Sequence, residues 1–168
     1  MTSIDELNSS LFLACMTADE SEALAALQAG AHVDYQNDHK ISPLLVCVGG
    51  VGPPSLVEKL LMAGASVDMT DCVGWSPLIF VASSGQVPLF DILIHYGANI
   101  NHRSSDEKDK GWTPLTRAAY RGHAALVDKL IRLKADLSAL SDGKTALELA
   151  SEQGHEEVIA LLQRELRD

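Results

Sequence analysis

The feature that most limits how this chain can fold is that its sequence repeats with a period of roughly 33 residues. One mark of the repeat is the series SPLL, SPLI, TPLT and TALE, which begin at residues 42, 76, 113 and 145. A second mark is the series GAHVD, GASVD, GANIN and KADLS, which begin at residues 30, 64, 97 and 134. Two independent marks with one period predict stacked units, because a unit this short cannot bury its own apolar face.

The sequence of each unit predicts two short helices joined by a tight turn. A Ser or Thr at the first mark can cap a helix through its hydroxyl, and Pro is well tolerated in the next position. The predicted caps are Ser42, Ser76, Thr113 and Thr145. Thr145 lacks the following Pro, but Glu148 three residues later predicts a capping box. The segment 124–133, AALVDKLIRL, has apolar residues at helical spacing. Gly64 and Gly97 follow the second helices, where a left-handed residue is needed.

On these marks the chain resembles the ankyrin-repeat proteins over nearly its whole length. The resemblance implies an all-α solenoid of stacked helix-turn-helix units with projecting β-hairpin-like loops. We expect one domain, 1–168, with approximate repeats 1–37, 38–71, 72–108, 109–140 and 141–168, the first and last acting as caps. In the first unit, Ser9-Ser10-Leu11 stands where Thr-Pro-Leu belongs. Repeat 72–108 carries a lengthened loop, with four extra residues between Gly97 and Thr113.

Composition narrows the class of partner. The 168 residues are 46% apolar and 5% aromatic, with a formal net charge of −10. An acidic protein is repelled by nucleic acid and by anionic lipid, so neither is expected as a partner. The acids concentrate at the ends: residues 1–40 hold seven acids and one Lys, and residues 145–168 hold six acids and two Arg. These ends are interpreted either as solubilising caps or as an acidic binding patch.

The cysteines and the N-terminus bear on location. Three cysteines without a CxxC pair do not predict a disulfide framework or a zinc site, which favours a reducing compartment. The opening MTSIDELNSS does not resemble a signal peptide, and no run approaches the ~18 apolar residues of a membrane helix. A cytoplasmic location is expected, with the nucleus as the alternative.

Motifs for catalysis or cofactor binding are not found. The sequence has no HExxH and no GxSxG, and VGGVGPP at 48–54 lacks the Gly-Lys-Ser/Thr ending of a phosphate loop. The segment 48–54 instead predicts a lengthened turn, with Pro53-Pro54 starting the next helix. We therefore expect no enzyme activity, no cofactor and no metal site.

Several reactive residue types are interpreted as structural. His123 and His155 follow the inter-helix glycine of two repeats, a register that predicts structural hydrogen bonds. Cys15 and Cys47 fall at small-residue positions of first helices and are expected to be buried thiols, whereas Cys72 is expected in an exposed loop. The resemblance also implies that Asn101 could accept the asparagine hydroxylation known in the family, although Asn99 replaces the usual acid.

The resemblance places the loops and first helices on a concave face. The column before the first mark holds Ile41, Trp75, Trp112 and Lys144, and the column four residues after it holds Leu13, Val46, Phe80, Arg117 and Leu149. Later columns hold Met16, Thr17, Ser83, Ser84, Tyr120, Arg121, Glu152 and Gln153. Repeats three and four thus bring together residue types that dominate binding hot spots. The protein-binding candidates are Trp75, Phe80, Trp112, Arg117, Tyr120, Arg121, Ile41 and Lys110.

Two interpretations of the tryptophans remain open. The indoles could form a continuous aromatic ridge for a partner, or each could pack on its neighbouring loop and stiffen the turn. The charged run at 103–110 is interpreted either as a solvated loop tip or as a binding finger. By resemblance, the chain is a non-catalytic, monomeric protein–protein interaction module, such as an adaptor, inhibitor or assembly chaperone. The alternatives are an obligate regulatory subunit of an enzyme and, in another class, a small-ligand receptor or enzyme.

Overall fold

The computed structural model describes residues 2–50, 52–105 and 111–167. Within these residues the chain forms ten helices, which confirms the all-α expectation. They are α1 (Ile4–Thr17), α2 (Glu20–Gln28), α3 (Pro43–Gly49), α4 (Pro54–Met62), α5 (Pro77–Ser84), α6 (Val87–His95), α7 (Pro114–Arg121), α8 (Ala124–Arg132), α9 (Ala146–Gln153) and α10 (Glu156–Glu165). Lys110, one of the predicted binding residues, and most of the charged run lie outside the described residues.

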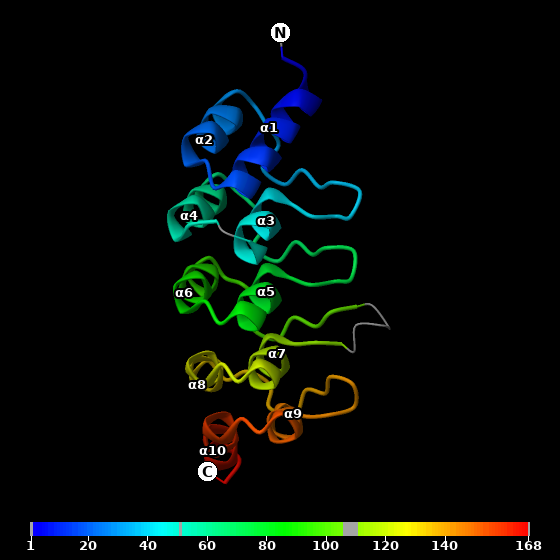
Figure 1. The fold of residues 1–168 in the computed structure, drawn as a ribbon, viewed down its shortest axis with the longest axis vertical. Helices are drawn as coiled ribbons and strands as arrows, with labels where there is room; N and C mark the ends of the chain where they lie inside the picture. Colours follow the sequence, from blue (N-terminus) through cyan, green and yellow to red (C-terminus); the bar gives the residue numbers. More distant parts are fainter. Residues whose placement is uncertain (1, 51, 106–110, 168) are drawn as a thin grey trace.

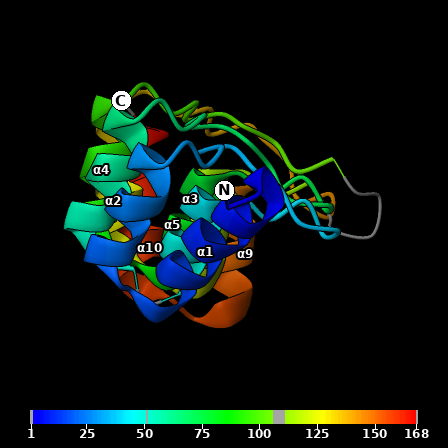
Figure 2. The same cartoon turned by 90° about the horizontal axis from the view of Figure 1, so that it is seen from above.

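The helices form a stack of sequential pairs (Figure 1). The first helices, α1, α3, α5, α7 and α9, lie one above another, and the second helices form a parallel column beside them. The connections between pairs project together to the side of the first helices, away from the second helices (Figure 2). One apolar core runs through the stack, because each unit buries its apolar side chains against the next.

Three of the four predicted caps act through their hydroxyls. The backbone N–H of Leu45 donates to Ser42 Oγ at 3.3 Å, and Thr145 forms the expected capping box with Glu148. Thr113 forms a capping box with Thr116, a pairing between two hydroxyl side chains. These bonds satisfy backbone donors that a helix start leaves without an intrahelical acceptor.

For the remaining predicted cap, Ser76, the prediction of a side-chain cap was wrong. Its backbone is extended, as an N-cap requires, but its buried Oγ has no hydrogen-bond partner among the described residues. The reason is local: the N–H of Ile79, which the hydroxyl would cap, donates at 3.0 Å to the main-chain carbonyl of Ser76 instead. The helix start therefore rests on the backbone and on Pro77.

The first unit also differs from the sequence interpretation. Ser9 and Ser10 do not start a helix, because α1 already begins at Ile4 and runs for 14 residues. Its start is a capping box between Ser3 and Glu6. Leu11 is fully buried, like Leu44 of the next unit, so the repeat register holds although the helix start does not.

Polar bonds join neighbouring units on two sides of the stack. On the loop side, Asp34, Asp68 and Asn101 each accept a hydrogen bond from a backbone N–H of the following unit, at 2.9–3.0 Å. On the turn side, the rings of His123 and His155 donate through Nε2 to the carbonyls of Ser83 and Tyr120, at 3.1 and 3.0 Å. The predicted structural role of the two histidines is confirmed.

A main-chain hydrogen bond closes the base of each of three projecting loops. These bonds run from Asn37 N–H to the Ile41 carbonyl, from Asp71 to Trp75 and from Ser104 to Trp112. The pair is four positions apart in the first two loops and eight in the third. Among the described residues only the fourth loop contains a β-bridge, between Ser141 and Lys144.

Candidate protein-binding surface

The side chain of Arg117 is the centre of an aromatic cluster on the first-helix face. Its guanidinium carbon lies 4.7 Å from the ring centroid of Trp75, 4.8 Å from that of Trp112 and 5.7 Å from that of Tyr120. Its Nε donates to Ser83 Oγ at 3.1 Å. A cation held over several ring faces is attracted by the aromatic quadrupoles, so the cluster fixes both the guanidinium and the rings.

The two tryptophans do not form the exposed ridge that was one interpretation of the sequence. Trp112 is only 6% exposed and packs with Ile79 and Leu149, which belong to the units on either side. Trp75 is half-buried and meets Phe80 edge-on, with 5.1 Å between the ring centroids. Trp112 thus packs against its neighbours, as the second interpretation expected, and Arg117 lies between the two indoles. The role of Trp112 in binding stays a prediction.

A basic hollow lies beside this cluster. It has a volume of about 350 Å³, and its lining residues come from α3, α5 and α7 together with Trp75. The described lining contains Arg117, Arg121, Trp75, Phe80, Ser83, Ser84, Val48 and Gly49, and no acidic residue. Arg121 is exposed and makes no ion pair with any other described residue. In a chain with a net charge of −10, this is an unusual concentration of positive charge.

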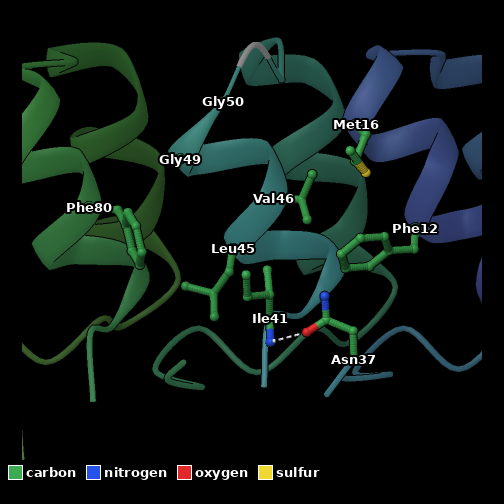
Figure 3. Close-up of a pocket in the computed structure, with 9 residues that line it drawn as sticks. All are labelled: Phe12, Met16, Asn37, Ile41, Leu45, Val46, Gly49, Gly50 and Phe80. Atoms are coloured by element: carbon green, nitrogen blue, oxygen red, sulfur yellow. Dashed lines mark hydrogen bonds between the residues drawn. The ribbon is translucent and has the colours of Figure 1, made fainter. Parts of the chain in front are cut away.

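A second hollow, which is apolar, lies further toward the N-terminus (Figure 3). It has a volume of about 380 Å³ and is lined mainly by aliphatic and aromatic side chains. Figure 3 shows Phe12 and Met16 from α1 on one side, Phe80 from α5 on the other, and Ile41, Leu45 and Val46 between them. The side chain of Asn37 closes the loop edge by accepting the backbone N–H of Ile41 at 3.0 Å.

The two hollows are neighbours, because Phe80 and Gly49 line both of them. We call their union the groove; it crosses α1, α3, α5 and α7. The predicted binding residues Ile41, Phe80, Arg117 and Arg121 lie in it, together with Trp75, while Tyr120 packs behind Arg117. The columns read from the sequence also contained Met16, Val46, Ser83 and Ser84, which line the groove.

Phe12 and Leu45 of the lining were missed by the sequence reading. Both immediately precede a residue of the column four positions after the cap, so extending that column by one position would have found them. Lys144, which the sequence placed in the same row as the tryptophans, lies outside the groove lining and pairs with Glu152 at 2.6 Å. The hydrogen bond that Lys144 donates to the Glu152 carboxylate raises the pKa of Lys144 above its ordinary value.

Comparison with known proteins decides the family. The family model described as ankyrin repeats matches residues 11–104, 44–139 and 102–167. This chain is an ankyrin-repeat protein. Its ten described helices in sequential pairs are consistent with about five ankyrin repeats.

Curated relatives share only part of this ankyrin chain. The "Ankyrin repeat, SAM and basic leucine zipper domain-containing protein 1" of Echinops telfairi is 51% identical over 59 residues, 35% of this chain and 12% of the relative. The proteins of the same description from Nomascus leucogenys and Pan troglodytes are 45% identical over 60 residues, 36% of this chain and 12% of each relative. The match thus spans a small part of those proteins.

The described part of this ankyrin protein bears on the expectations for metal-binding and cysteine residues. No group of three or more His, Cys, Asp or Glu side chains there is placed to hold a metal ion. Cys15 and Cys47 are buried and in contact, and Cys72 is exposed, as predicted. The hydrogen bond with Cys15, together with burial, raises the pKa of Cys47, so its thiol keeps its proton. No described helix has both the length and the apolar character that a membrane crossing requires.

The side chain of Asn101, the predicted hydroxylation position, is part of the ladder between units. Its Oδ1 accepts the backbone N–H of Asp136 at 2.9 Å, and its own N–H donates to Asn99. The residue is exposed. Hydroxylation at this position stays a prediction.

Proposed function

We propose that this chain is a monomeric, non-catalytic module that binds another protein on the face formed by its first helices and loops. The contacts would come mainly from repeats three and four, and the molecule would act as an adaptor, inhibitor or assembly chaperone in the cytoplasm or nucleus. Ankyrin repeats in general mediate protein–protein interactions, which supports the class of function. The three unpaired cysteines support a reducing compartment.

The observation that carries the proposal is the basic hollow beside Arg117. Aromatic and arginine side chains that are already held in place lose little conformational entropy on binding, and they are the residue types that dominate hot spots. Trp75 and Phe80 supply a half-exposed aromatic edge, and Arg117 is fixed between rings. A partner that covered this hollow would therefore meet a preformed surface.

The proposal is tested by affinity capture from native lysate with the wild type and three variants. Ser84→Trp fills the hollow from an exposed position at the end of α5, and Arg121→Glu cancels the positive charge of its described lining, because Arg117 then faces a Glu. Arg132→Glu is the matched control, because Arg132 is an exposed base on the second helix α8, where it pairs with Asp128. We expect a specific partner to be lost with both hollow variants and retained with the control.

Capture that is equal for all four proteins would contradict the proposal. Circular dichroism should show the same helix content in each variant, since all three positions are exposed. Sedimentation and thermal unfolding of the purified wild type separate this function from that of an obligate subunit. A chain that is folded and monomeric alone supports a module that binds and releases.

A further inference from the structure

The groove changes character along its length, and this change specifies the chemistry of what it can hold. At the α1 end, Phe12, Met16 and Val46 offer an apolar surface, and no charged side chain is among the described residues that line it. At the α7 end, Arg117 and Arg121 are the only charged residues of the described lining. Phe80 belongs to both ends and joins them.

From this gradient we infer that the groove binds an extended protein segment that carries a bulky apolar side chain and, about three residues away, an Asp or Glu. The inference rests on the proposed function and names the partner chemistry for the same face. Charge complementarity selects the acidic residue, because both charged side chains of the described lining are arginines, in a chain with a net charge of −10. The apolar hollow, at about 380 Å³, is within the size range of pockets that hold small ligands, so it has room for a bulky apolar side chain.

The spacing follows from the stack. The apolar hollow spans α1, α3 and α5, and the basic hollow spans α3, α5 and α7, so their centres are offset by one unit. Packed helices lie about 8–10 Å apart. An extended chain advances about 3.3 Å per residue, so about three residues separate the two anchors. A segment of uniform charge, or one without an apolar anchor, would fill only half of the groove.

The two ends can be altered independently at exposed positions. Met16 is 55% exposed, so Met16→Glu places a negative charge at the apolar end without opening a cavity in the core. Arg121→Glu cancels the positive charge of the described lining at the basic end, and Arg132→Glu on α8 again serves as the control. Circular dichroism on each variant establishes that the fold is retained.

The experiment selects binders from a displayed library of random peptides about 12 residues long, using the full chain and each variant as bait. Wild type and Arg132→Glu should enrich peptides with Asp or Glu about three positions from Leu, Ile, Met or Phe. Arg121→Glu should lose the acidic preference and keep the apolar one, and Met16→Glu should do the reverse. For one synthesised wild-type binder, changing its acid to the amide should weaken binding to wild type about tenfold and to Arg121→Glu less than about twofold.

Several outcomes would overturn the inference. These are no enrichment with wild type, enriched peptides without an acid, or an acidic preference that survives Arg121→Glu. Sedimentation showing a dimer that Met16→Glu dissociates would also overturn it, since a second copy would then occupy the groove. If lysate capture still depends on Ser84 and Arg121 while the selected peptides lack the pattern, the proposed function stands and only the inference about chemistry fails.

Discussion

Repeats three and four begin with nearly the same sequence, GWSPL and GWTPL, yet the two starts are built differently. In repeat three the indole is half-exposed and the cap hydroxyl has no partner among the described residues. In repeat four the indole is buried, and the cap hydroxyl belongs to a network of Thr113, Thr116 and Ser141. The burial of the indole depends on the neighbouring units, and the cap depends on the residue three positions after it, which is Ile79 in one repeat and Thr116 in the other.

The largest expected difference between the two starts concerns the tryptophans. Trp112→Ala should destabilise the fold by about 3–5 kcal/mol, because it removes a buried aromatic side chain and leaves a cavity. Trp75→Ala should cost less, about 1–2 kcal/mol, because that indole is only partly buried. Urea unfolding followed by circular dichroism measures both free energies.

Fluorescence supplies an independent check on the same pair. Each variant retains one tryptophan, so the emission of Trp75→Ala reports Trp112 alone and should lie to the blue of that of Trp112→Ala. Equal losses of stability together with equal emission maxima would show that the two indoles have the same environment, against the packing described above.

Removing the cap hydroxyls of the two repeats should give a smaller difference in the free energy of unfolding than removing the tryptophans. Thr113→Ala should destabilise by about 1–2 kcal/mol, since it removes the acceptor for the Thr116 N–H at the start of α7. Ser76→Ala should change stability by less than about 0.5 kcal/mol, because it deletes a buried hydroxyl that makes no bond. The measurement is again the free energy of unfolding in urea. A large loss for Ser76→Ala would mean that its hydroxyl does find a partner.

The smallest effect is expected where the second helices of the two repeats end. Gly97 after α6 has a φ of +85°, and Lys134 occupies the matching left-handed position after α8 with a φ of +62°. A side chain is disfavoured in this region, so Lys134→Gly should stabilise by about 0.5–1 kcal/mol. Thermal unfolding should show a raised Tm.

Lys134→Ala is the control for that substitution. It also removes the exposed ion pair with Glu165, whose atoms are 3.5 Å apart, but it keeps a Cβ at positive φ. Exposed ion pairs of this kind contribute little to the free energy of unfolding. A gain with Ala as large as with Gly would assign the effect to the removed lysine chain and contradict the backbone argument.

The sequence predicted the backbone of the fold well, because the marks of the repeat act locally. Gly64 and Gly97 have the positive φ values that a helix C-terminus requires, and Thr145 caps its helix with Glu148 as expected. His123 and His155 could be assigned because both stand at one position of the repeat, where the preceding unit offers a carbonyl.

From the sequence, the residues of the candidate site could be assigned only to rows of equivalent repeat positions. The columns placed Phe80, Arg117 and Arg121 together, but the position of a side chain within a row depends on which neighbour fills the space. Arg117 fills the space between the indoles, and this buries Trp112, a result that no single unit encodes. Ser76 failed as a side-chain cap for a different, local reason, since its own carbonyl accepts the amide that the hydroxyl would cap.

The ladder of Asp34, Asp68 and Asn101 has a mechanical consequence. Each side chain links one unit only to the next, so each junction between units can deform independently of the others. A slight rotation at each junction adds along the axis, while the contacts inside a unit scarcely change. The groove crosses three such junctions, from α1 to α7. Its two ends can therefore approach or separate elastically, and the compliance of the junctions sets how closely a bound segment must match their separation.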